Sequence, residues 1–155
     1  MPGAKQAKPA PPRPPGGPVA DPLLALQGYR LRRASAASMA ELADRLRKLE
    51  LRPSEASVLL VVRGNPGITP GEAGRLLGIA SANFAPLAAR LARRGWLSRV
   101  RRDGRSQRLI LSPSGRRLAR ESWRIMEGLD QELLARIPAR QRAHFHAVLR
   151  ALTPA

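Results

Sequence analysis

Segment 90–108 constrains the fold of this chain most, because the spacing of its apolar residues changes partway along it. Up to Gly95 the apolar residues recur every three to four positions, which is helical spacing. Residues 96–101 and 107–111 then form two short runs around a polar, glycine-containing stretch, the pattern of a β-hairpin. The segment contains eight arginines and a single acidic residue, Asp103. It therefore predicts a helix followed by a hairpin with an arginine-rich tip.

Helix-start and helix-stop signals divide the rest of the chain into further helices. Four stretches carry a proline where a first helical turn tolerates it; they are Asp21-Pro22, Pro53-Ser54-Glu55, Thr69-Pro70-Gly71-Glu72 and Ser112-Pro113. The stop signals are Arg52-Pro53, Gly78, Gly95 and Pro138-Ala139. The predicted order is four helices, the hairpin and two more helices. This mainly α fold with a small β-hairpin wing (α+β) is a winged helix-turn-helix, a fold that binds DNA.

Apolar residues at helical spacing are expected to form the core. Before the hairpin strands, the residues expected inside are Ala56, Leu59, Leu60, Val62, Ala73, Leu76, Leu77, Phe84, Leu87, Leu91 and Trp96. One face of the long helix after the hairpin is expected to carry Leu118, Ser122, Ile125, Leu129 and Leu133. Ile68 is expected to form a very short strand.

Composition excludes several classes of function. The formal net charge is +17, and +11 of it lies between Arg52 and Arg120, which favours phosphate polymers or anionic membranes as partners. Without cysteine the chain has no thiol redox switch, disulfide or Cys-based zinc site. His144 and His146 are two residues apart on a helix and make a poor metal pair. The acids are scattered and no phosphate loop or nucleophile elbow occurs, so no enzyme, metal or cofactor is expected.

The chain is expected to be a cytosolic protein without a membrane role. No apolar run reaches the roughly 18–20 residues that span a bilayer, and the arginines are not spread along an amphipathic face. The N-terminus lacks the apolar region of a secretory leader. Four regions are expected, in order a disordered, proline-rich basic tail (1–20), an N-terminal dimerisation helix region (21–50), a DNA-binding lobe (51–112) and C-terminal dimerisation helices (113–155).

Several motifs follow one another at a characteristic spacing between Leu24 and Leu152. They are Leu51-Arg52-Pro53-Ser54, Asn65-Pro66-Gly67-Ile68-Thr69, Leu76-Leu77-Gly78-Ile79, the stretch from Leu87 to Leu97, Asp103-Gly104-Arg105 and Leu111-Ser112-Pro113-Ser114-Gly115-Arg116. Together they resemble the multiple-antibiotic-resistance regulator (MarR) family. The resemblance implies a homodimeric bacterial transcription regulator of the repressor type, acting at the nucleoid. It also implies release of DNA when a small aromatic or anionic ligand binds.

In this interpretation the helix over residues 81–94 lies in the major groove of double-stranded DNA. Asn83 could make a paired contact to adenine, or it could merely cap the helix. Pro86 departs from the family, which often has a polar or basic residue there; it is tolerated if the regular helix starts near Asn83. The recognition-helix residues expected at DNA are Ser81, Ala82, Asn83, Ala85, Pro86, Arg90, Arg93 and Arg94.

The tip of the hairpin is expected to enter the minor groove through Arg105, with Asp103 holding the tip in shape. The alternative is that Asp103 and Arg105 form an exposed surface pair of little consequence. The wing residues expected at DNA are Arg99, Arg101, Arg102, Asp103, Arg105 and Arg108.

A two-fold dimer is expected because apolar residues at the two ends of the chain exceed what one thin lobe can bury. The expected interface residues are Leu23, Leu26, Leu129, Leu133, Phe145, Val148, Leu149 and Leu152. A pocket for an aromatic carboxylate effector would be lined by Tyr29, Arg33, Trp123 and Met126, although simple packing is the alternative role of Trp123. The competing function is a non-specific nucleic-acid-binding architectural protein.

Overall fold

The computed structural model describes Val19, residues 21–101 and residues 107–153 of the 155-residue chain. Of the predicted disordered tail (1–20), only Val19 is described. The predicted wing tip, with Arg102, Asp103 and Arg105, also lies outside the described residues. Two compact units divide between Ser35 and Ala36, and each is described by itself. Within the described ranges no helix is both long enough and apolar enough to cross a membrane.

In the N-terminal unit, the helical region predicted to start at Asp21 is interrupted. Asp21 caps a 3-10 turn, Pro22–Ala25, by accepting a hydrogen bond from the Leu23 amide (3.1 Å). Leu26 is extended, and α1 (Gln27–Leu46) begins after it. The Asp21 carboxylate also accepts the Tyr29 hydroxyl hydrogen bond, at 3.2 Å. The predicted helix start with Asp21 as N-cap is therefore confirmed, but extended Leu26 interrupts the helical region that follows.

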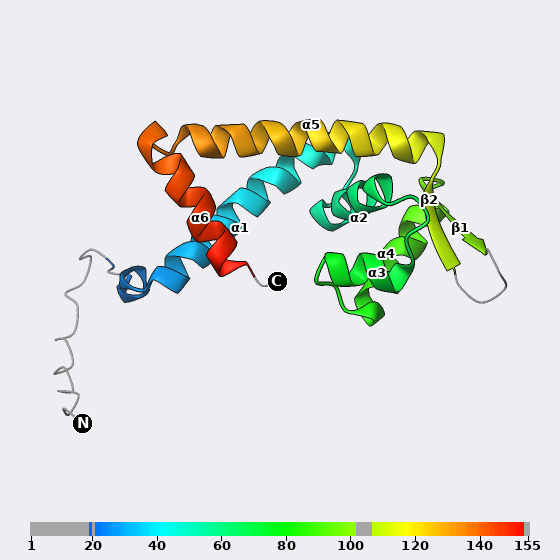
Figure 1. The fold of residues 1–155 in the computed structure, drawn as a ribbon, viewed down its shortest axis with the longest axis horizontal. Coiled ribbons are helices and arrows are strands. Elements are labelled where there is room, and N and C mark those ends of the chain that lie inside the picture. The colour runs from blue at the N-terminus through cyan, green and yellow to red at the C-terminus, as the bar shows by residue number, and fades with distance from the viewer. Residues whose placement is uncertain (1–18, 20, 102–106, 154–155) are drawn as a thin grey trace, which may run out of the picture. The chain divides into compact units, whose positions relative to one another are not determined.

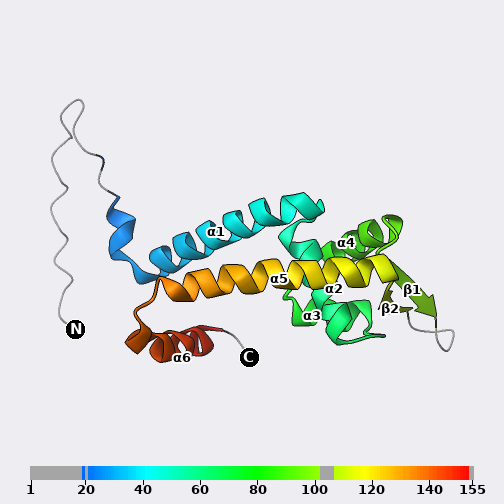
Figure 2. The same ribbon diagram turned by 90° about the horizontal axis from the view of Figure 1, so that it is seen from above.

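The larger unit consists of helices with the two-stranded hairpin at one end, beside α4 and the start of α5, as Figures 1 and 2 show. Its elements after α1 are α2 (Pro53–Gly64), α3 (Pro70–Leu76), α4 (Ser81–Arg93), β1 (Leu97–Arg101), β2 (Gln107–Leu111), α5 (Pro113–Ala135) and α6 (Arg142–Leu152). α2 contacts α5 on one side and α3, α4 and β2 on others, so it is the centre of this unit. The mainly α winged helix-turn-helix fold is confirmed.

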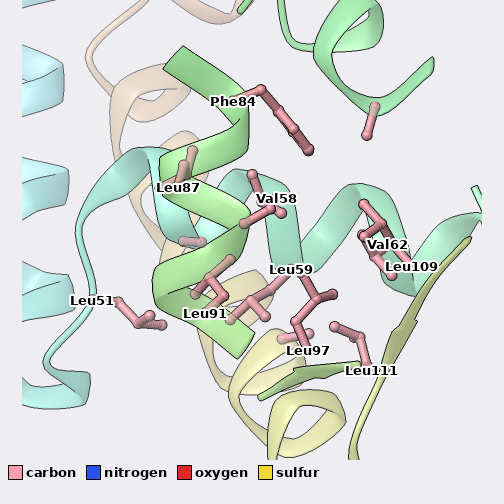
Figure 3. Close-up of a cluster of buried hydrophobic side chains, with 14 of the residues drawn as sticks. Leu51, Val58, Leu59, Val62, Phe84, Leu87, Leu91, Leu97, Leu109 and Leu111 are labelled. Carbon is pink, nitrogen blue, oxygen red and sulfur yellow. The ribbon is translucent and has the colours of Figure 1, made fainter. Parts of the chain in front are cut away.

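Side chains from every element around α2 meet in one apolar core. Figure 3 shows Leu59 of α2, Leu91 of α4 and the two strand leucines Leu97 and Leu111 gathered together. Burial of such side chains contributes roughly 1.5–3 kcal/mol each. The core fixes α4 and the hairpin relative to α2.

Local sequence signals set the ends of these elements. The Thr69 hydroxyl accepts a hydrogen bond from the Glu72 amide (3.2 Å), and the Glu72 carboxylate accepts one from the Thr69 amide (2.8 Å), which is the predicted capping box of α3. Gly78 and Gly95, with φ of +63° and +71°, end α3 and α4 in the left-handed region that favours glycine. α1 ends earlier than predicted, at Leu46, followed by a 3-10 turn.

The hairpin is antiparallel, with Leu97 opposite Leu111 and Arg101 opposite Gln107. Ile68 adds a bridge to Leu109, through hydrogen bonds of 2.9 Å from the Gly67 and Leu109 amides. The predicted short strand at Ile68 is thereby confirmed. It ties the base of the hairpin to the turn between α2 and α3.

Several burial predictions were wrong in detail. Leu76 is 65% exposed, because α3 has only seven residues and packs through Ala73 and Gly74 instead. Leu60, Leu77 and Trp96 are half-buried. Val58 and Glu55 are buried although neither was predicted to be.

Candidate nucleic-acid interface

α4 has a buried face and an exposed face. Phe84, Leu87, Ala88 and Leu91 point into the core, which accounts for the helical spacing in the sequence. Ser81, Ala82, Asn83, Ala85 and Pro86 are all exposed, so the N-terminal half of α4 is open on its outer side. In a helix-turn-helix this half of the second helix contacts base edges.

Asn83 is the third residue of α4 and does not cap it. The N-cap is Ala80, which offers no side-chain capping hydrogen bond, and the Asn83 backbone amide donates to the Ala80 carbonyl (2.9 Å). The exposed Asn83 amide side chain makes no hydrogen bond to any residue in the described part of the chain. Of the two roles considered for Asn83, capping is therefore excluded.

Pro86 lies deeper in the helix than predicted. α4 starts at Ser81 rather than near Asn83, so Pro86 is its sixth residue and lies in the second turn. Because proline has no amide hydrogen, the Ala82 carbonyl loses its usual donor four residues on. With Asn83, Pro86 borders a surface hollow of about 480 Å³ beside α4.

Two of the arginines predicted at DNA have acidic partners inside the larger unit. The Arg90 Nε lies 2.8 Å from the Oε1 of buried Glu55, an ion pair whose angle falls outside hydrogen-bond geometry. Arg94 forms an ion pair with Glu50 (2.6 Å), donates to the Glu50 carbonyl (2.8 Å) and covers the Trp96 ring at 3.8 Å. Both guanidinium groups therefore hold α4 to the chain before and at the start of α2.

Glu50 and Glu55 were not predicted as partners of these arginines. Glu50 lies 44 residues from Arg94, and Glu55 lies 35 residues from Arg90, and no local pattern links residues so far apart. The available signal was only that Glu55 is one of three acids between Arg52 and Arg120.

The remaining arginines of α4 and the hairpin whose side chains the structure describes have no acidic partner among the described residues, and one of them, Arg99, reaches the backbone of α4. Arg93 is exposed and pairs with no acid among the described residues. Arg99 of β1 donates to the Ala85 carbonyl (3.3 Å), and Arg108 of β2 donates to the Gly67 carbonyl (3.2 Å). The backbone of Arg101 ends β1. Basic side chains thus come from both α4 and the hairpin.

The residues expected to line an effector pocket have defined surroundings. In the N-terminal unit the carboxylate of Asp21 joins the two candidates there, accepting from the Tyr29 hydroxyl and, at 3.4 Å, from Arg33. On α5, Trp123 is 51% exposed and Met126 packs against the core of the larger unit.

Residues expected at a dimer interface retain exposed apolar surface. Leu23, Leu26, Val148 and Leu152 are between 46% and 60% exposed. The half-buried members are Leu129, Leu133, Phe145 and Leu149. Among the described residues, no group of three His, Cys, Asp or Glu side chains could hold a metal ion.

Known transcription regulators share sequence and fold with this chain. Residues 49–106 match the model of the MarR family. The chain is 26% identical to the transcriptional repressor CouR bound to a 23-mer DNA duplex, with a TM-score of 0.76, covering 87% of this chain and 97% of that one. None of the curated proteins matches the chain.

Two further structures have the same fold. The PcaV transcriptional regulator from Streptomyces coelicolor, in complex with its natural ligand, is 28% identical with a TM-score of 0.74, covering 86% of this chain and 96% of that one. Wild-type MarR from E. coli, in its apo form, is 22% identical with a TM-score of 0.70, covering 83% of this chain and 97% of that one.

Proposed function

We propose that the chain is a repressor of the MarR type that binds double-stranded operator DNA sequence-specifically as a homodimer, because residues 49–106 match the MarR family model and transcription regulators 26% and 28% identical to the chain share its fold. The observation that supports this most is the open N-terminal half of α4 beside arginines of both α4 and the hairpin. The solved CouR complex shows that a relative with this fold binds duplex DNA. The proposed place of action is the nucleoid of the bacterial cytoplasm.

Different residues carry different parts of the proposed contact. Asn83 hydrogen-bonds a base edge, because its amide is the paired donor and acceptor at the start of α4. Arg93 and Arg99 bind phosphates, since both are exposed on the same side as the open half of α4. Arg105 enters the minor groove, with Asp103 beside it. The remaining contacts of the wing, to the sugar–phosphate backbone of the DNA, come from Arg101, Arg102 and Arg108.

Arg90 and Arg94 have a different role in this proposal. Each already has an acidic partner, so each orients α4 and offers only its remaining N–H groups to phosphate. Their main contribution is to hold the recognition helix in position.

Dimerisation uses the exposed apolar residues of α6 and of the N-terminal turn. Leu152 and Leu26 are 60% and 58% exposed, and a second copy would remove both from water. Two copies related by a two-fold axis present two α4 helices about 34–36 Å apart, which matches successive major grooves.

A small aromatic carboxylate would relieve repression in this proposal. The candidate residues for this ligand are Tyr29 and Arg33 in the N-terminal unit and Trp123 and Met126 in the larger unit, and the PcaV relative is solved with its natural ligand. The Asp21 carboxylate would have to release Arg33 when such an anion binds.

Selection of bound fragments from random DNA, at near-physiological salt, tests the function. A near-palindromic consensus with half-sites one helical turn apart is expected. Enrichment of no consensus, with random duplexes bound as tightly as any selected one, would instead support the architectural protein that the charge of +17 also allows.

A further inference from the structure

The exposed face of α4 has few side chains able to hydrogen-bond a base. Along one stripe it carries Ala82, Ala85, Pro86 and Ala89, and the first long polar side chain on that stripe is Arg93. We propose that this apolar stripe recognises DNA through the 5-methyl groups of thymine in the major groove. The inference rests on the proposed function and specifies what the same interface reads.

The stripe is not part of the protein core. Ala82, Ala85 and Pro86 are exposed, while Phe84 and Leu87 of the same turns are buried on the opposite face. Residues three to four apart share one face of a helix, so the three exposed residues form a continuous surface. Among the described residues Arg99 of β1 reaches the Ala85 carbonyl (3.3 Å), and the side chains of Ala82, Ala85 and Pro86 stay exposed beside it.

The size of these side chains suits close approach to the groove floor. A methyl group or a pyrrolidine ring keeps the helix axis near the bases, whereas longer side chains would hold it away. Among the four base pairs, only those with thymine present a methyl group in the major groove, and alanine contacts it favourably. Burying one methyl-sized group contributes roughly 0.8 kcal/mol, or about fourfold in affinity.

Two of the three arginines at the end of this helix are engaged elsewhere, and the third, Arg93, is assigned to phosphate by the proposed function. Arg90 pairs with Glu55 and Arg94 with Glu50, so neither guanidinium is available as an unpaired fork for the guanine edge. Asn83, at the edge of the stripe, remains to hydrogen-bond adenine. The face therefore favours half-sites in which thymine methyl groups lie next to an adenine.

Replacing thymine by deoxyuridine in the selected operator tests this, because only the 5-methyl group is removed while base pairing is kept. Binding of the full chain is measured by fluorescence anisotropy on duplexes with deoxyuridine at each half-site thymine in turn. We expect affinity to fall about fourfold at each contacted position. Equal binding of thymine and deoxyuridine duplexes would overturn the inference and leave the proposed function standing.

Two variants locate the effect on the protein. Ala85→Gly removes one methyl group from the stripe, so the ratio of the affinities for the thymine and deoxyuridine duplexes should fall toward one at the position that Ala85 touches. Arg93→Ala is the matched control. Loss of a phosphate contact should weaken binding to both duplexes by the same factor, so the ratio of the two affinities should stay unchanged. An affinity ratio that Ala85→Gly leaves intact at every position would overturn the assignment to this stripe. Failure to recover any operator would overturn the proposed function, and this inference with it.

Discussion

Glu55 is a buried carboxylate that serves two helices at once. It is 2% exposed; its Oε2 accepts from the Arg52 amide at the start of α2 (2.8 Å), and its Oε1 lies 2.8 Å from the Arg90 Nε on α4. Removing one partner of such a pair leaves the other charge without compensation. This residue therefore links the stability of the lobe to the position of the recognition helix.

Glu55→Gln should lower the free energy of unfolding by about 3 kcal/mol, the lower end for a broken buried ion pair, because Arg90 is partly exposed. Urea denaturation measures it. Arg90→Met and the double variant complete a double-mutant cycle. We expect the double variant to lose clearly less free energy of unfolding than the two single variants lose together. Strictly additive losses would contradict the pairing.

Gly115, in the first turn of α5, lies against the backbone at the start of the hairpin. A Cβ at this position would lie 2.0 Å from the Trp96 carbonyl oxygen, so α5 and the residue before β1 would have to separate. Gly115→Ala should cost about 2–3 kcal/mol, as overpacking does, and lower the midpoint of urea unfolding. Gly71→Ala, where no atom lies within 4 Å, is the control and should cost nothing. Equal stability of the two variants would show that the close approach does not exist in solution.

Arg105 is the wing residue expected to matter most for DNA binding. Arg105→Ala should weaken operator binding about tenfold to hundredfold, since one guanidinium leaves the minor groove, while the sedimentation coefficient of the protein stays the same. Arg140→Ala, at an exposed arginine of the turn before α6, serves as control and should bind like the parent. A variant at Arg105 with parental affinity would remove the wing from the interface.

At the scale of the element, the capping box of α3 makes the helix-turn-helix sensitive to acid. Hydrogen bonds from the Thr69 hydroxyl (2.7 Å) and amide (2.8 Å) lower the pKa of the Glu72 carboxyl. A group with a lowered pKa in the folded state stabilises the protein above its unfolded pKa, and that contribution is lost as pH falls through the folded pKa.

Glu72→Gln should therefore flatten the fall in stability between about pH 5 and pH 3, measured as the free energy of unfolding at each pH. Thr69→Ala should flatten it in part, because the amide of residue 69 still donates. If the free energy of unfolding falls as steeply toward low pH in Glu72→Gln as in the parent, protonation of the Glu72 carboxyl is not linked to folding.

Elements whose signals are local could be predicted from the sequence, and those set by distant partners could not. The capping box at Thr69, the glycine stops at Gly78 and Gly95, and the hairpin strands need only a few neighbouring residues. Leu76 was misassigned because a helix of two turns does not reveal which side it buries. The pairing of Arg90 and Arg94 with Glu55 and Glu50 depends on packing of α4 against the start of α2, and sequence spacing carries no information about it.

At the scale of the molecule, positive charge and exposed apolar surface have separate uses in the proposed complex. Arginines on α4 and the hairpin face the phosphates, whose counterions are released on binding, with a slope of about −0.9 per contact in a logarithmic plot against salt. Apolar residues such as Leu152 of α6 are left for a second copy. Within the larger unit, Arg45 near the end of α1 donates hydrogen bonds of 2.8 and 2.5 Å to the Glu132 carboxylate of α5, which ties that end of α1 to α5.

The most direct test of the central claim, a two-fold dimer that reads DNA with paired recognition helices, is sedimentation velocity of the full chain alone and with a fluorescent duplex carrying the selected site. We expect a dimer at micromolar concentration and two chains on each duplex. We also expect a scrambled duplex to bind much more weakly than the selected one at near-physiological salt. A monomer that coats selected and scrambled duplexes alike, without fixed stoichiometry, would contradict this claim.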